Sequence, residues 1–334
     1  MKEIPACPVC GASDALPLET YDDPVGGARY DLFTCASCAL VFSRPMEFPG
    51  APWYQRFNYV CGYEDTACAA SKTRFPYFLD RLPAPHAGRL LDIGCASGHF
   101  LAMAAARGYD VEGLDVDERF VALAQAAGLK GVRQGVLDEG FAREHQGAYV
   151  AVAIMEVLEH VADPLSFLGL CREMLKPGGF LLVSVPDNRR PTPFGRDVWD
   201  FPPHHLTRWN PGSLKLALER AGFDPGDIGS IPISTSEYSR IWADRSAQWI
   251  LRFIKRLLYG AGTSQKPMDD LIAQDASRSA VPDKSTRVKM VARYHSVFMA
   301  LTFPFFYLVL VYYALTQPRA GLSILAVARK NSDV

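Results

Sequence analysis

The chain has 334 residues, more than one typical domain, so we expect a core domain with additions. Its 35 Lys and Arg residues nearly balance 36 Asp and Glu residues, and the formal net charge of −1 argues against a strongly basic nucleic-acid binder. The first residues, MKEIPACPVCG, lack the apolar core of a signal peptide. We therefore expect a folded cytoplasmic protein.

Four of the eight cysteines form two C-x-x-C pairs near the N-terminus. The pairs are Cys7 with Cys10 and Cys35 with Cys38. A two-residue gap lets two thiolates on one turn bind the same ion, and two such turns supply four ligands for tetrahedral zinc. Tyr30–Phe33, between the pairs, suits a short strand of a hairpin. We predict a zinc ribbon with a structural role; a docking site for a substrate or carrier is the alternative.

Residues 90–117 carry the most informative pattern of the chain. An apolar run ends at Asp92, Gly94 and Gly98 follow, an alanine-rich helical stretch comes next, and a second apolar run ends at Asp115. Glycines let the backbone approach a ligand, a helix N-terminus offers free N–H groups, and Asp115 can accept two hydroxyl protons from a ribose. The pattern predicts a nucleoside site, with an ordinary strand–turn–helix as the alternative.

The order of residues in this turn favours one kind of nucleoside. It reads D-x-G-x-A-x-G, with an acid before the first glycine and Ala96 in the middle. An acid at that place would repel the pyrophosphate of a dinucleotide but suits a cationic ligand with an amino group and a sulfonium.

The middle of the chain continues the alternation of strands and helices. Tyr149–Ile154 is a continuous apolar run and predicts a buried parallel strand. Apolar residues at helical spacing follow from Leu165 to Leu175, Lys-Pro-Gly-Gly at 176–179 should stop that helix, and Phe180–Val185 predicts another strand.

The C-terminal third contains a long apolar run. Val297–Leu315 is just long enough to span a bilayer, yet Leu322–Lys330 has the pattern of a last sheet strand, paired antiparallel with Ile228–Ile233. A single crossing would separate these two strands, so an in-plane or re-entrant element, or a helix buried in its own domain or a dimer, fits better. Residues 241–259 form a basic amphipathic pattern with tryptophans, which favours contact with a membrane surface over packing on the core.

Several motifs in order resemble a known family. The acid-first glycine turn resembles motif I of the class I S-adenosylmethionine (SAM) methyltransferases. Glu-His-Val-x-Asp-Pro at 159–164, Leu-Lys-Pro-Gly-Gly at 175–179 and Pro-His-His-Leu at 203–206 resemble the ubiquinone-biosynthesis and methyltransferase-23 type. The resemblance covers roughly residues 85–235 and the last dozen.

The resemblance implies an α/β fold with a Rossmann-like, seven-stranded methyltransferase sheet. The expected domains are a zinc ribbon (1–48), a methyltransferase domain with N-terminal lid helices (49–235), a helical, partly membrane-prone insertion (236–319), and the last strand with the tail (320–334). Within the lid region, Tyr63 is a candidate to cover the cofactor, with a core position as the alternative.

The resemblance also implies the residues that bind SAM. Asp92 would lie near the methionine amino end, Asp115 would bind the ribose hydroxyls, and the turn would give backbone access. Leu137 and Asp138 would flank the adenine, and Met155 and Glu156 would line the floor. The expected set is Asp92, Gly94, Ala96, Gly98, Asp115, Leu137, Asp138, Met155 and Glu156.

Three histidines are candidates for a general base. His160 follows the fourth predicted strand, and His204 and His205 lie on a loop that should reach over the same edge of the sheet. Histidine titrates near neutrality, which suits removal of a proton from an acceptor. Transfer driven by proximity alone, without a base, is the alternative.

Together these features predict a SAM-dependent methyltransferase that acts on a hydroxyl or similar nucleophile of a small-molecule, lipid-linked or glycan acceptor. The alternatives are an RNA methyltransferase whose zinc ribbon docks RNA, and a non-catalytic SAM-binding scaffold. Peripheral binding to the inner face of the membrane through 241–259 and 297–315 is a further expectation.

Overall fold

The computed structural model describes residues 4–23, 26–55, 74–82, 88–190, 196, 198–230 and 322–331. Tyr63 and the segments 241–259 and 297–315, for which membrane contact is predicted, lie outside these residues. Within the described part, no helix has both the length and the apolar character needed to cross a membrane.

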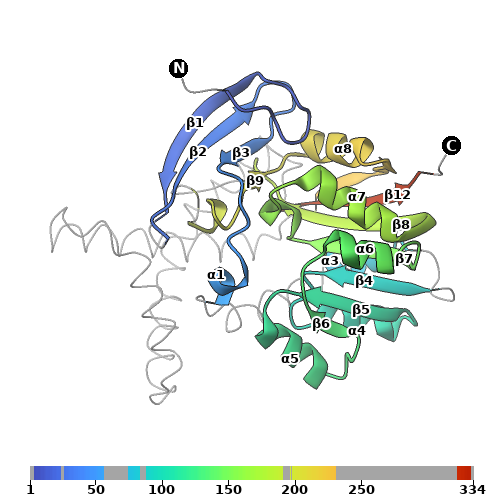
Figure 1. The fold of residues 1–334 in the computed structure, drawn as a ribbon. Coiled ribbons are helices and arrows are strands. Elements are labelled where there is room, and N and C mark those ends of the chain that lie inside the picture. Colours follow the sequence, from blue (N-terminus) through green and yellow to red (C-terminus); the bar gives the residue numbers. More distant parts are fainter. Residues whose placement is uncertain are drawn as a thin grey trace, which may run out of the picture.

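The core of the protein is a mixed sheet in the order β10-β12-β8-β7-β4-β5-β6, with β11 also paired to β12 (Figure 1). The strands are β4 (Arg89–Ile93), β5 (Asp110–Asp115), β6 (Val132–Gln134), β7 (Tyr149–Met155), β8 (Leu175–Pro186), β10 (Phe223–Asp224), β11 (Ile228–Ser230) and β12 (Ser323–Lys330). The pairs among β4 to β8 are parallel, and β12 runs antiparallel to β8. This arrangement confirms the predicted α/β methyltransferase sheet.

The edge of the sheet differs from the expectation in one respect. The strand expected at 228–233 is confirmed as β11 for Ile228–Ser230, antiparallel to β12, while residues 231–233 lie outside the described residues. A second short strand, β10, was not expected and pairs with the other end of β12. Pro225 and Gly226 lie between them, and Gly226 has a left-handed backbone with φ 55°. Proline has no N–H for the ladder and the left-handed turn redirects the chain, so the seventh position of the sheet is split in two.

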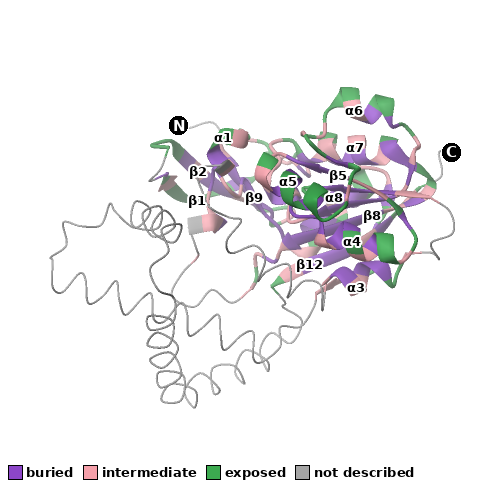
Figure 2. Cartoon of the chain, turned by 90° about the horizontal axis from the view of Figure 1, so that it is seen from below, coloured by how far each residue is buried: buried purple, intermediate pink, exposed green. Residues whose placement is uncertain are grey.

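Helices cover both faces of the sheet, and the buried residues concentrate between them and the strands (Figure 2). One face packs α3 (Arg74–Leu79), α4 (His99–Ala106) and α5 (Glu118–Ala126). The other packs α6 (Glu139–Glu144), α7 (Pro164–Met174) and α8 (Pro211–Arg220). Strand β7 is apolar throughout because Ala151 and Ala153 face the first layer while Val152 and Ile154 face the second.

The Lys-Pro-Gly-Gly segment at 176–179 follows the end of α7 and is part of strand β8. It lies inside β8, between the pairs Tyr149–Leu175 and Ala151–Phe180, so residues 176–179 form a bulge opposite Val150. Gly178 adopts φ 70°, a conformation that disfavours other residues. The expected strand Phe180–Val185 is therefore the second part of a longer strand.

The N-terminal segment forms a second, four-stranded antiparallel sheet. Its strands are β1 (Ala15–Asp22), β2 (Arg29–Cys35), β3 (Val41–Arg44) and β9 (Thr207–Arg208). The strand predicted at 30–33 lies within β2. The last strand, β9, was not expected, because it lies more than 160 residues after β3 in the chain. The ribbon packs beside α8 and shares one hydrophobic core with α7 and α8 (Figure 1).

Candidate active site

A cavity of about 510 Å³ lies where the carboxyl ends of β4 to β7 meet. This is the edge at which parallel α/β sheets bind ligands. Six of the predicted site residues line it: Gly94, Asp115, Leu137, Glu156, His160 and His204. The opposite wall includes Phe48 and Tyr54, the latter on the short helix α1 (Ala51–Gln55).

The glycine turn after β4 brings backbone to the cavity. Gly94, Ala96 and Gly98 have φ values of 74°, 45° and 80°, so all three adopt left-handed conformations. A Cβ on Gly94 would lie 2.5 Å from Cγ2 of Val157, and one on Gly98 would lie 2.3 Å from Cδ1 of Leu129. Both the left-handed backbone and these close approaches therefore favour glycine at these two positions.

Asp115 ends β5 inside the cavity, where it is 9% exposed. Its Oδ2 accepts the N–H of Ala96 at 2.8 Å, and its Oδ1 accepts the N–H of Asp117 at 2.9 Å. Burial raises the pKa of this carboxyl, and the two backbone donors oppose that change. A carboxylate has about four acceptor sites, so each oxygen keeps capacity for one ribose hydroxyl.

The other predicted SAM-binding residues do not line the cavity. Asp92 is only 3% exposed, and burial together with the charge of Asp115 holds the pKa of its carboxyl well above the usual value. Asp138 caps α6 by accepting the N–H of Phe141 at 2.8 Å. Met155 packs against the apolar layer of α4. Ala96 and Gly98 shape the turn, and the direct roles predicted for these five residues stay predictions.

The three candidate histidines form one partly buried cluster, although they come from two parts of the chain. His160 ends the short helix η1 (Leu158–His160), and its ring centroid lies 4.6 Å from that of His204 and 5.0 Å from that of His205. Burial lowers the pKa of all three imidazoles, so they are neutral near pH 7. His160 and His204 line the cavity, whereas His205 lies behind them.

The tautomer of His160 follows from its partner. Its Nδ1 lies 2.5 Å from the carbonyl oxygen of His204, which can only accept, so Nδ1 carries the proton. The lone pair is therefore on Nε2, the atom able to take up a proton. His204 is oriented in the same way, with Nδ1 2.8 Å from the carbonyl oxygen of Trp199.

Glu159 lies at the centre of this cluster and was not singled out from the sequence. Its carboxyl is buried, and both oxygens lack a hydrogen-bond partner within the described part of the chain. Oε1 lies 3.9 Å from Nε2 of His160 and 3.9 Å from Nε2 of His205. Burial and the charge of Glu156 hold its pKa well above the usual value. The three histidines each offer a ring nitrogen within 4.8 Å of the others, a spacing that one divalent cation can bridge.

Two further residues of the site were also missed. The hydroxyl of Tyr54 is buried and has no hydrogen-bond partner among described residues, and the ring lies 6.0 Å from that of His160. Arg74 on α3 donates from Nη1 to Oε1 of Glu156 at 2.6 Å and to Oγ of Ser184 at 3.3 Å. Glu156 itself has φ 58°, a strained value typical of functional positions. Residues 46–85 are rich in aromatic residues, which is the one sequence signal that could have indicated Tyr54, and nothing local indicated Arg74.

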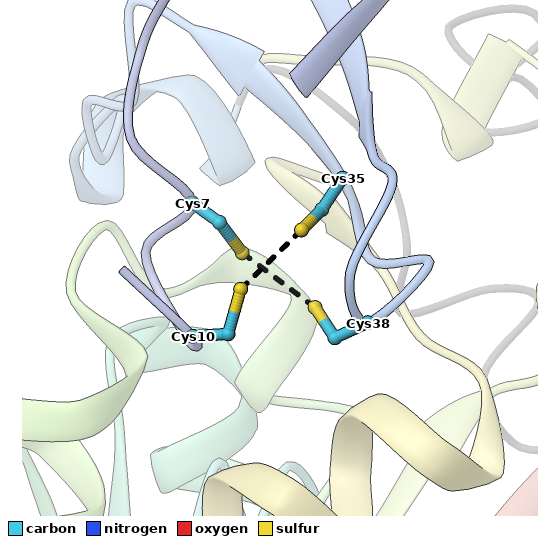
Figure 3. Close-up of side chains that lie close together, drawn as sticks. All are labelled: Cys7, Cys10, Cys35 and Cys38. Carbon is cyan, nitrogen blue, oxygen red and sulfur yellow. Dashed lines mark hydrogen bonds between the residues drawn. The ribbon is translucent and has the colours of Figure 1, made fainter. Parts of the chain in front are cut away.

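The four predicted zinc ligands converge on one point (Figure 3). The Sγ atoms of Cys7 and Cys38 lie 3.7 Å apart, and those of Cys10 and Cys35 lie 3.3 Å apart. Zinc–sulfur bonds of about 2.3 Å in a tetrahedron place sulfurs about 3.8 Å apart, so the donor set fits the ion.

The two cysteine turns are also built alike. Cys7 and Cys35 each accept, through the carbonyl oxygen, an N–H four residues later at 2.9 Å. The donors, Gly11 and Ala39, both have left-handed backbones, with φ 71° and 57°. Two equivalent turns that aim two thiols each at one centre are the arrangement of a zinc ribbon.

Comparison with known proteins identifies the family. Residues 63–225 match the family described as "Methyltransferase domain". The ubiquinone biosynthesis O-methyltransferase of Cereibacter sphaeroides is 34% identical over 178 residues, which cover 49% of this chain and 71% of that protein. The chain belongs to the SAM-dependent methyltransferases. The cofactor predicted from the glycine turn is thereby confirmed as SAM.

A second relative and a solved structure are also similar to this methyltransferase. The ubiquinone biosynthesis O-methyltransferase of Marinobacter nauticus is 43% identical over 113 residues, or 32% of this chain and 47% of that protein. The crystal structure of a SAM-dependent methyltransferase from Mesorhizobium loti matches with a TM-score of 0.42 and 19% identity, covering 76% of this chain and 96% of that one.

Proposed function

We propose that this methyltransferase moves the methyl group of SAM to a hydroxyl oxygen of a small, largely apolar acceptor. The observation that carries the proposal is one cavity lined by Asp115 on the cofactor side and by His160 and His204 on the other. Phe48 and Phe167 are among its apolar walls. The relatives named O-methyltransferases support oxygen as the attacking atom.

In this proposal the residues of the strand ends bind and orient SAM. Asp115 accepts the ribose hydroxyls, and Leu137 packs against the adenine. Bound SAM supplies a methyl group already activated by its sulfonium. The enclosed site holds the acceptor in line with that group and excludes water, which is the main requirement of such a transfer.

The histidine cluster handles the proton of the acceptor. As the acceptor oxygen would form its bond to the methyl group, the bond between that methyl group and the sulfonium sulfur would break, with its electron pair going to sulfur. The proton of the acceptor would pass to Nε2 of His160, a neutral ring that carries no proton at that atom. The carbonyl of His204 holds the ring in place. Tyr54 lines the same cavity, and we assign to its hydroxyl, which has no hydrogen-bond partner among the described residues, a hydrogen bond to the acceptor.

We also propose that Cys7, Cys10, Cys35 and Cys38 bind a structural zinc ion. Lipid-linked or glycan acceptors, contact of 241–259 and 297–315 with a membrane, and the domain limits at 48, 235 and 319 stay predictions. The RNA-methylating and non-catalytic alternatives gain no support from the relatives.

The proposed function is tested by incubating the enzyme with labelled SAM and a panel of small phenols and diphenols with and without apolar substituents. We expect labelled O-methyl ethers, with lower KM for the apolar members. Tyr54→Phe should raise KM for the acceptor about tenfold and leave SAM affinity unchanged, because one buried hydrogen bond is lost.

The control for that variant is Tyr21→Phe, which lies on β1 and stacks on Phe201 outside the cavity. Transfer of label to nitrogen or carbon, and not to oxygen, would contradict the proposed chemistry. Equal KM values of Tyr54→Phe and the wild type for the acceptor would contradict the proposed hydrogen bond between Tyr54 and the acceptor.

We expect the pH dependence of kcat to follow His160. Burial lowers the pKa of this imidazole, so the neutral form that accepts a proton persists below the ordinary histidine pKa of about 6.5. The rate should stay constant from about pH 8 to about pH 6.5 and fall only at lower pH, measured with saturating SAM. Loss of activity with a midpoint above about pH 7 would contradict a buried neutral base.

A further inference from the structure

Both cysteine turns are bound to the two ends of one helix of the methyltransferase domain. At the start of α8, Nδ2 of Asn210 donates to the carbonyl oxygens of Cys38 at 3.2 Å and Ala39 at 2.9 Å. At its end, Nη1 of Arg220 donates to the carbonyl oxygen of Val9 at 3.0 Å. Each turn of the ribbon is therefore held by one end of α8.

The ribbon also continues into the loop that carries two of the histidines. Strand β3 pairs with β9 through Val41–Arg208 and Phe42–Thr207, directly after His204 and His205. The N–H of Ser43 donates to the carbonyl oxygen of Leu206 at 3.0 Å. Strand β9 has only two residues, too few to keep its place without a partner strand.

The same loop is bound on its other side to the base of the site. The N–H of Leu206 donates to the carbonyl oxygen of Glu159 at 2.8 Å, and the carbonyl oxygen of His204 contacts Nδ1 of His160. The loop thus lies between the ribbon and the turn that carries Glu159 and His160. A shift of the ribbon would be transmitted to the histidines through these bonds.

The burial of the ribbon's side chains shows that the ribbon packs against the methyltransferase domain and is not a separate module. Cys7, Cys35 and Phe42 are at most 2% exposed and belong to the same apolar cluster as Leu214 of α8 and Trp209 beside β9. A docking module that meets its partner independently would not need its metal-binding turns in the core of the catalytic domain.

From these contacts we propose that the four-cysteine ribbon is a positioning element of the active site. With metal on its thiolates, β3 and Asn210 hold residues 204–206 in register against His160, so occupancy of the ribbon sets the rate of methyl transfer and not the affinity for SAM. The inference rests on the proposed role of the histidine cluster.

Two variants separate the contact of Asn210 with the ribbon from its role as the N-cap of α8. Asn210→Asp keeps the side-chain oxygen that accepts the N–H of Ser213 at 3.0 Å, but loses both donors to the ribbon. Ser213→Ala loses the reciprocal bond of the capping box and keeps the ribbon contact. We expect Asn210→Asp to lower kcat about tenfold or more with unchanged SAM affinity, since small misplacements are costly, and Ser213→Ala to keep kcat within about twofold.

A second measurement does not depend on activity. Zinc is removed from the whole enzyme with a mercurial reagent and a chelator, the metal content is measured, and backbone hydrogen exchange is followed by mass spectrometry. Peptides covering 203–209 should lose protection while peptides covering β4 and β5 keep theirs, and restored zinc should reverse the change.

The outcomes separate this inference from the proposed function. Unchanged exchange at 203–209 in zinc-free enzyme, or an Asn210→Asp variant with wild-type kcat, would overturn the positioning role while methyl transfer stands. An enzyme that methylates no hydroxyl would overturn the proposed function, and the exchange measurement would still decide whether the ribbon holds the loop. If zinc removal also abolishes SAM binding, the ribbon stabilises the fold as a whole, and the inferred positioning role at residues 204–206 is wrong.

Discussion

Asp115→Asn should weaken SAM binding by at least about 100-fold. The carboxylate accepts two backbone N–H groups and has room for two ribose hydroxyls, and hydrogen bonds to a charged group contribute about 1.5–3 kcal/mol each. An amide has only one oxygen, and its NH2 group would face either the N–H of Ala96 or that of Asp117. Calorimetric titration with SAM measures the effect.

The matched control for this variant is Asp110→Asn at the other end of β5, where the side chain is 76% exposed. It should bind SAM like the wild type. Thermal unfolding of both variants separates loss of the site from loss of the fold. A dissociation constant for Asp115→Asn within about threefold of the wild type would refute the ribose-binding role.

His160→Gln is expected to lower kcat by about 10²- to 10⁴-fold, the range of a general base. Glutamine can still donate to the carbonyl oxygen of His204, so the loop keeps its contact while the proton-accepting nitrogen is lost. SAM affinity should not change, because Asp115 and the glycine turn are untouched. Initial rates at saturating SAM and acceptor provide the measurement.

Substitutions of two other histidines serve as controls for the kcat of His160→Gln. His145→Gln, on the C-terminal end of α6 and outside the cavity, controls for the substitution itself. His205→Gln should lower kcat less than His160→Gln, because His205 does not line the cavity. A kcat for His160→Gln near the wild-type value would mean that transfer proceeds by proximity without this base.

The cofactor and fold class could be predicted because their signals are local. The turn after β4 has left-handed backbone at Gly94 and Gly98, and Asp115 ends β5 beside that turn, where its carboxylate accepts the N–H of Ala96. The C-x-x-C pairs likewise lie within single turns, so chemistry at short range fixed the donor set of the ribbon. The strand–helix alternation then followed from apolar periodicity.

The edge strand and the Lys-Pro-Gly-Gly bulge show where local patterns stop being sufficient. The apolar pattern predicted the strand that begins at Ile228, but it gave no sign of β10, which forms because the other end of β12 lies opposite Phe223 and Asp224. The bulge at 176–179 depends on the register between β7 and β8. Register is a property of two strands, so one strand's sequence does not specify it.

By itself the sequence determined the α/β class, the SAM cofactor and the two cysteine pairs, since each of these signals lies in residues close together in the chain. Only the tertiary structure decided which histidines reach the cavity, that Glu159 and Tyr54 join them, and that the ribbon pairs with β9. The contact of His160 with His204 and the pairing of β3 with β9 join residues more than 40 positions apart, and such pairings are set by packing and register that local periodicity does not encode.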